Sequence, residues 1–144
     1  MNEKLMEKVR KKLEEGWIKS WMMIEVLAVT ESAAKSALEK HIGKMEREDK
    51  TIIFKKDFKK VIKVENPLPN IKEAYSHVVE LELVTETFEK LMYLVMVYAP
   101  SSVEILEPEN IKIDAGEAQS ILNSIAEMIH RFAAAGVGGM VISA

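Results

Sequence analysis

The chain has 144 residues, which is the usual length of one domain and is enough to bury a core of its own. Its formal net charge of −3, from 23 acidic and 20 basic residues, excludes an overall basic field of the kind that holds a phosphate backbone. The absence of cysteine excludes disulfides, zinc–thiolate sites and thiol nucleophiles.

The first predicted element is a charged helix over residues 2–15. Leu5, Val9 and Leu13 recur at intervals of four, and Gly16 follows where a left-handed cap is expected. This charged start is unlike the apolar centre of a signal peptide, and no run of the chain is long and apolar enough to span a bilayer. We therefore expect a cytoplasmic protein with no membrane partner.

A tetrapeptide repeat indicates two β-α-β units in tandem. Val29-Thr30-Glu31-Ser32 recurs 55 residues later as Val84-Thr85-Glu86-Thr87. An alternating, strand-like run precedes each copy and a run with helical spacing follows it. Thr30 and Thr85 are expected to cap these helices, because a threonine hydroxyl can accept from a free amide of the first turn. The strands are predicted at Met22–Val29 and Tyr75–Val84, and the helices at Glu31–Glu48 and Phe88–Ala99.

Two more strand-like segments complete the predicted fold. Thr51–Glu65 reads as a strand or a hairpin-like pair, the two prolines of Asn66–Asn70 mark a linker, and Val103–Leu106 is the fourth strand. The order βαββαβ over residues 17–108 is the ferredoxin-like arrangement, with antiparallel strands in the order 4-1-3-2 and both helices on one face. We predict one α+β domain over residues 1–144, with the extra N-terminal helix and, within residues 114–144, a long helix at Ala115–Ala133 and a glycine-rich tail.

The second repeat helix has no polar face between Leu91 and Tyr98, so it must be covered on two sides. The sheet face opposite the helices mixes apolar residues with glutamates, which is too apolar for a face left wholly in water. Both features predict a homo-oligomer, a dimer or larger. The predicted interface residues are Tyr93, Leu94, Val97, Met23 and Leu27.

The C-terminal helix carries the sharpest polar group. Gln119, Asn123 and His130 fall within about 40° of one another at 100° per residue, beside the apolar stripe. Amides and an imidazole in this position could bind a small polar ligand, or they could satisfy one another across an interface. No cofactor is predicted.

Two other clusters have a functional and a structural interpretation. Glu25, Glu80, Glu82 and Glu104 could bind a divalent cation if the strand register gathers them, or they could pair with lysines such as Lys55 and Lys63. The histidines show no metal-binding spacing; His41 is expected on the apolar side of its helix and His77 on the inner face of its strand. No metal site is predicted.

A basic-aromatic patch offers an alternative function. Lys55, Lys56, Lys59 and Lys60 lie near Phe54 and Phe58, and such residues on a common face can stack single-stranded bases. RNA-binding sheets of this topology carry their aromatics on the central strands, however. Glutamates occupy those positions here and repel phosphate, so the patch argues weakly for nucleic acid.

The stretch from Thr85 to Ile113, TETFEKLMYLVMVYAPSSVEILEPENIKI, contains the strand Val103-Glu104-Ile105-Leu106-Glu107-Pro108. This stretch resembles the end of the ferredoxin-like C-terminal extension of WYL-type bacterial transcription regulators. The resemblance implies the fold and a sensing or oligomerising role. It does not extend to DNA binding, since the chain has no WYL triplet and no room for a helix-turn-helix. We otherwise expect an uncharacterised prokaryotic, archaeal family, and a single glutamine with no cysteine favours a thermophilic source.

No catalytic motif is present, so the predicted function is a non-enzymatic, oligomeric module for small-ligand binding or assembly. One alternative is a small enzyme that uses His130 as a general base in a pocket beside the C-terminal helix. The other is a single-stranded nucleic-acid binder acting through Lys55–Lys60.

Overall fold

The computed structural model describes residues 2–136, and its contacts divide the chain into two compact units. Unit 1 extends to Asn110 and unit 2 begins at Ile111. The two units are described separately below. The single domain over residues 1–144 stays a prediction.

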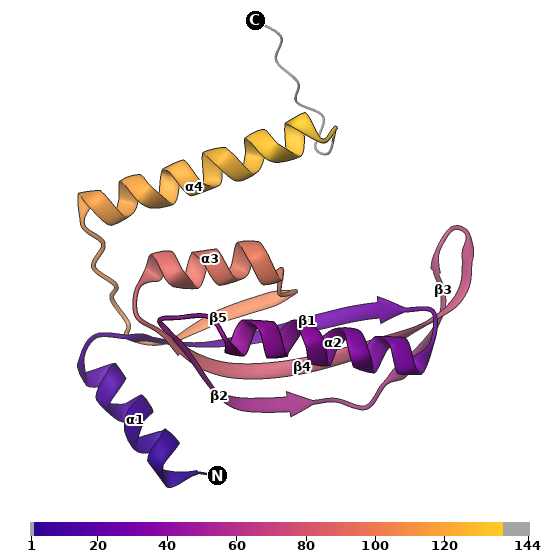
Figure 1. The fold of residues 1–144 in the computed structure, drawn as a ribbon, viewed down its shortest axis with the longest axis horizontal. Coiled ribbons are helices and arrows are strands. Elements are labelled where there is room, and N and C mark those ends of the chain that lie inside the picture. Colours follow the sequence, from indigo (N-terminus) through magenta and orange to yellow (C-terminus); the bar gives the residue numbers. More distant parts are fainter. Residues whose placement is uncertain (1, 137–144) are drawn as a thin grey trace, which may run out of the picture. The chain divides into compact units, whose positions relative to one another are not determined.

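Unit 1 is an α+β structure with three helices and a five-stranded antiparallel sheet, which confirms the predicted class (Figure 1). Its elements in chain order are α1 (Glu3–Glu14), β1 (Ile18–Ala28), α2 (Glu31–Glu46), β2 (Thr51–Phe58), β3 (Ile62–Leu68), β4 (Ile71–Thr85), α3 (Phe88–Tyr98) and β5 (Ser102–Glu107). The strands lie in the order β2-β4-β1-β5, and β3 pairs with the other half of β4. The long strands β1 and β4 therefore form the centre of the sheet.

The sheet has five strands, because the segment predicted as one strand or a hairpin-like pair forms two strands, β2 and β3, which pair with β4 and not with each other. The predicted linker Asn66–Asn70 is wrong: β3 continues to Leu68, which pairs with Ile71 across a tight turn. Asn66 takes a left-handed conformation (φ 51°) where the register shifts. Since β3 pairs on one side only, Pro67 can lie in this edge strand without breaking a ladder on its other side.

The core of unit 1 lies between one face of the sheet and α2. Met22 pairs with Leu81 and Ile24 with Val79, and all four side chains are buried. The helix α2 contacts β1 and β4 and also contacts α3. Its buried residues are Ala34, Leu38, Ile42 and Met45, which lie on the face predicted from their spacing. The other face of β1 and β4 carries apolar side chains such as Met23 and Leu27 together with Glu80 and Glu82.

The helix α1 ends before Gly16, as predicted, and begins after Asn2. The Asn2 side chain accepts from the amides of Lys4 and Leu5, and Gly16 takes the left-handed conformation (φ 97°) after the last turn. The helix contacts β2 and β4 near the end of the sheet where β2 begins (Figure 1). Val9 is its buried residue, so the apolar stripe of α1 serves to attach it to unit 1.

The two repeat copies differ in where the helix begins. Thr30 caps α2 as predicted, with its hydroxyl accepting from the amide of Ala33 at 3.0 Å. The prediction that Thr85 caps α3 is wrong, because β4 remains paired through Thr85, which lies opposite Ile18. Thr87 is the cap instead, and its hydroxyl accepts from the amide of Lys90 at 3.0 Å.

This difference predicts opposite effects of mutating two threonines that are two residues apart. Thr87→Ala removes a cap and should lower the free energy of unfolding by about 1 kcal/mol. The buried Thr85 hydroxyl has no hydrogen-bond partner among residues 2–136, so Thr85→Val should leave stability unchanged or raise it by about 1 kcal/mol. Urea unfolding followed by circular dichroism measures both. Thr30→Ala is the control and should match Thr87→Ala; a loss of stability in Thr85→Val would contradict the assignment.

Unit 2 consists of an extended segment and the helix α4 (Ala115–Ala134), which confirms the helix predicted there. The Asp114 side chain accepts from the amide of Glu117 at 2.8 Å and caps the helix. Gly136 takes a positive φ of 78° after the last turn. The other tail glycines and the possible strand at residues 140–142 lie outside the described residues.

Candidate functional site: the Lys90 network and the exposed faces

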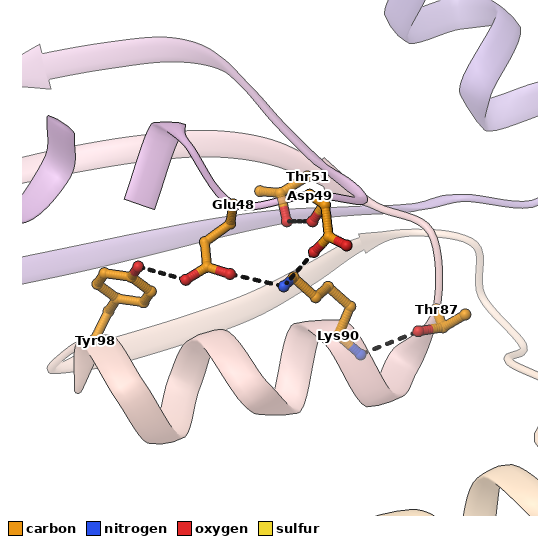
Figure 2. Close-up of polar contacts among 6 residues, drawn as sticks. All are labelled: Glu48, Asp49, Thr51, Thr87, Lys90 and Tyr98. Atoms are coloured by element: carbon orange, nitrogen blue, oxygen red, sulfur yellow. Dashed lines mark hydrogen bonds and ion pairs between the residues drawn. The ribbon is translucent and has the colours of Figure 1, made fainter. Parts of the chain in front are cut away.

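Lys90 connects α3 to the turn between α2 and β2. Its ammonium group donates to Glu48 Oε1 at 2.8 Å and to Asp49 Oδ1 at 3.1 Å. The hydroxyl of Tyr98, at the other end of α3, donates to Glu48 Oε2 at 2.6 Å. Figure 2 shows Glu48 lying between Lys90 and Tyr98, so one carboxylate bridges both ends of the helix. We call Glu48, Asp49, Lys90 and Tyr98 the Lys90 network.

Burial and the hydrogen bonds within the Lys90 network shift the pKa values of its members. The side chains of Lys90 and Glu48 are 12% and 18% exposed, whereas Asp49 is exposed. Hydrogen bonds from Lys90 and Tyr98 lower the pKa of Glu48. Burial alone would lower the pKa of Lys90, yet its hydrogen bonds to Glu48 and Asp49 raise that pKa overall.

Tyr98 is held in its neutral form. Burial, followed by its hydrogen bond to Glu48, raises the pKa of its phenol. At neutral pH the network therefore contains an ammonium, two carboxylates and a neutral phenol, and none of these groups titrates near pH 7. A general base needs a pKa near the working pH. Through Glu48 the network acts as a clamp that ties both ends of α3 to the turn after α2.

Further contacts extend this clamp on both sides. The ammonium of Lys90 lies 4.4 Å from the centre of the Tyr93 ring, within range of a cation–π interaction. His41 Nε2 of α2 lies 2.8 Å from the carbonyl oxygen of Tyr98, so this nitrogen must carry a proton and donate it. The rings of His41 and Tyr98 meet edge-on at 5.2 Å. These contacts fix α3 against α2 and orient Tyr93 on the outer side.

One feature of the sequence indicates this network, although the hydrophobic periodicity does not reveal it. Lys90 is the only basic residue in α3, whose other residues after Glu89 are apolar or aromatic. A lone cation in an apolar helix requires a carboxylate partner when it is buried. The partners lie about forty residues earlier in the sequence, and only the tertiary structure places Glu48 and Asp49 beside it.

Three of the four glutamates of the open sheet face have separate partners. Glu80 accepts from Trp21 Nε1 at 3.1 Å and pairs with Lys59 at 2.9 Å, and Glu82 pairs with Lys55 at 3.3 Å. Lys59 and Trp21 lower the pKa of Glu80. The register places Glu82 and Glu104 on either side of Trp21, whereas Glu25 lies further along β1 and accepts from Ser76.

Two of the four glutamates, Glu80 and Glu82, form ion pairs with lysines. Lys63 pairs with Glu73 at 2.9 Å and not with any of the four. Within residues 2–136, no three His, Cys, Asp or Glu side chains are grouped so as to hold a metal ion. The cavity beside Trp21, Glu80 and Glu82 has a volume of about 50 Å³, which is too small for an organic ligand. His77 is also isolated, and its ring packs at 5.8 Å on Phe58 of β2.

The basic-aromatic patch is largely neutralised by carboxylates. Lys55 and Lys59 pair with acids of the sheet, and Lys56 pairs with Glu46 of α2 at 3.0 Å. The Phe58 ring packs on His77, and Lys19 lies 5.8 Å from the centre of the Phe54 ring. The structure therefore adds no support for nucleic-acid binding through Lys55–Lys60.

The predicted polar group of α4 is only partly brought together. Gln119 Nε2 donates to Asn123 Oδ1 at 3.4 Å, and both side chains are exposed. His130 lies two turns further, about 10 Å along the helix axis at 1.5 Å per residue. It is exposed, and no hydrogen bond joins it to another residue of the described chain. Unit 2 by itself therefore does not close these three residues into a pocket.

Comparison with known proteins gives one match. A model of the MJ0538 family matches residues 19–141, which is most of the chain. The chain belongs to the MJ0538 family. This MJ0538 family match spans both units, from the first residues of β1 to beyond α4. No curated protein and no solved structure matches the chain.

The family match bears on two predictions. It supports an uncharacterised family, and the MJ0538 family carries no named function to transfer. The resemblance of residues 85–113 to WYL-type regulators is not confirmed. No helix in residues 2–136 of this MJ0538 family member has the length and hydropathy to cross a membrane.

The predicted interface residues of this MJ0538 family chain lie in different environments. Tyr93 and Val97 are 42% and 49% exposed and lie one turn apart on the outer side of α3. Leu94 is fully buried and belongs to the core of unit 1. Leu27 is exposed on β1, and Met23 is half-buried between Ser102 and Glu80.

Proposed function

We propose that this MJ0538 family chain is a non-enzymatic assembly module that forms homo-oligomers through exposed apolar helix faces on a ferredoxin-like scaffold. One observation carries the proposal: α4 is a 20-residue amphipathic helix with no buried residue. Leu122, Ile125, Ile129 and Phe132 of its apolar stripe are between 36% and 62% exposed. Within residues 111–136, unit 2 has no second helix or strand that could cover this stripe.

A second uncovered face supports the same function. Tyr93 and Val97 project from the outer side of α3, which the Lys90 network holds rigidly from the inner side. Apolar side chains on a fixed helix lose little entropy on association, so such a face suits a permanent interface. A small-ligand site remains a proposal at the junction of subunits, with Gln119, Asn123 and His130 as candidate residues.

Light scattering over a range of concentrations tests the proposal. We expect a mass of at least twice the 16.3 kDa of the chain. Leu122→Glu combined with Ile129→Glu should reduce the mass to that of one chain, and Tyr93→Glu with Val97→Glu should weaken association at least tenfold. Ala37→Glu, on an exposed position of α2, is the control and should leave the mass unchanged.

Two results would count against the proposal. A wild-type chain that stays monomeric at all concentrations would show that its own units cover both faces. A His130→Ala variant that keeps its mass but loses a measurable turnover would favour the enzyme alternative.

A further inference from the structure

The two edges of the sheet differ in how well they are protected against pairing with another strand. A free edge presents unpaired amide and carbonyl groups, and proteins block such edges with lysines, prolines and bulges. The β2/β3 edge has all three: lysines at 55, 56, 59, 60 and 63, Pro67, and register shifts at Ile53/Lys55 and Glu65/Leu68. It is therefore poorly suited to adding a strand.

The β5 edge has little of this protection. The strand pairs with β1 on one side only, and all six of its residues are exposed. Ser102–Glu107, with the sequence SVEILE, contains no lysine, proline or glycine. The register shift near Lys19 falls at the end of β5 and leaves Ser102–Ile105 regularly paired. Val103 and Ile105 are branched residues of high strand propensity and are exposed at this edge.

We infer that β5 pairs antiparallel with β5 of a second copy, about a two-fold axis at Val103, so that the two sheets continue into one. This inference rests on the proposed homo-oligomer and names where its subunits join. Antiparallel pairing of a strand with its own copy is consistent with a two-fold axis, which gives both chains the same contacts.

The charges of β5 permit this register and disfavour the neighbouring one centred on Glu104. With Val103 opposite its own copy, Ser102 lies opposite Glu104 of the second copy, and a serine hydroxyl can donate to a carboxylate. A pairing centred on Glu104 would place two glutamates directly opposite one another, which is destabilising. The register also places Ser101 opposite Ile105, so no like charges face each other between Ser101 and Ile105.

The neighbouring helix adds apolar surface on the same edge. The helix α3 leads into β5 through Ala99–Ser101, so the end of α3 that carries Val97 lies beside the beginning of β5. Val103 pairs with the buried Met22, which places it on the face of the sheet that carries the core. A second copy joined at β5 therefore brings two additional apolar side chains, Val97 and Val103, to the junction from each subunit.

The chain has no cysteine, so a single introduced cysteine reports on one position. Residues opposite one another in an antiparallel pair have Cα atoms about 4.5–5.5 Å apart, which lies within the range of a disulfide. Val103→Cys should form a covalent dimer under mild oxidation, at protein concentrations where the wild type is a dimer. The control Asp57→Cys, exposed on the opposite edge, should remain uncrosslinked.

A second variant tests the same edge without oxidation. Val103→Lys should place one lysine from each subunit at the axis, where the two charges repel, and so reduce the mass measured by light scattering. Circular dichroism should show that the variant keeps its fold, since Val103 is already 37% exposed. If the wild type is an oligomer, but Val103→Cys does not crosslink and Val103→Lys does not dissociate, the edge inference is overturned and the assembly module still stands. A monomeric wild type would overturn both.

Discussion

Leu94→Ala is expected to lower the free energy of unfolding by about 3 kcal/mol, because it leaves a cavity in a close-packed core. Leu94 is fully buried and lies between Leu91 and Tyr98, the other buried residues of α3. Urea unfolding of the whole protein measures this change in the free energy of unfolding. It is followed by circular dichroism at a concentration where the protein is monomeric. The folded variant should have the same oligomeric mass as the wild type.

Tyr93→Ala is the matched control, since its side chain lies about 100° around the helix from Leu94, on the exposed side. With Tyr93 partly exposed, truncation should cost less than about 1 kcal/mol of monomer stability while weakening association. The reverse pattern, a stable Leu94→Ala chain with altered mass, would show that Leu94 lies at an interface as its sequence position first predicted.

Lys90→Met is expected to lower the free energy of unfolding by about 2 kcal/mol at pH 7. The substitution keeps most of the apolar volume but leaves the Glu48 carboxylate, which is 18% exposed, without its cation. Removing one partner of a buried ion pair is costly, because the remaining charge stays partly desolvated. Lys35→Met is the control: its pair with Glu31 is exposed, and its loss should change stability by less than about 0.5 kcal/mol.

The difference between wild type and Lys90→Met should depend on pH in a defined direction. The network lowers the pKa of Glu48 from its ordinary value of 4.5. A lowered carboxyl pKa contributes stability that is fully present above pH 4.5 and is lost as the pH falls through the folded-state pKa. Urea unfolding from pH 7 to pH 3 should therefore show a difference that is constant down to about pH 5 and then shrinks. A difference that stays the same at pH 3 would mean that packing, and not charge, accounts for it.

Much of unit 1 could be predicted because local patterns and tertiary burial agree there. The alternation in β1 and β4 assigns Met22, Ile24, Val79 and Leu81 to the buried face, and the register pairs them. The spacing of the apolar residues in α2 likewise identifies its buried face. In these elements a period of two or 3.6 residues is sufficient to identify the inner side.

The errors arose where a non-local pairing decided the local structure. Thr85 has the sequence context of a helix cap, but its pairing opposite Ile18 and Thr51 keeps it in the sheet. Pro67 suggested a linker, yet an edge strand tolerates it. Neither outcome follows from a window of neighbouring residues, because both depend on which strand lies alongside.

The candidate site was harder to predict because its partners are distant in the sequence. Lys90 and Glu48 come from different elements, and their hydrogen bond depends on how α3 lies against the turn after α2. The sequence of α3 has no polar face, which predicts that two sides of the helix are covered. It does not indicate which residues are buried within unit 1, such as Leu94, and which are exposed, such as Tyr93. That assignment requires the rotation of the helix, which tertiary packing determines.

The position of β4 in the sheet also constrains how the chain can fold as it is synthesised. β1, β2 and β3 all lie within residues 18–68, and none of them pairs with another of the three. Each of them pairs with β4, whose last residue is Thr85, and β1 also pairs with β5. A nascent chain that ends before β4 would thus leave the backbone groups of β1 without a strand to pair with. Folding must proceed by insertion of a late strand between earlier ones, a route dominated by long-range contacts and therefore slow.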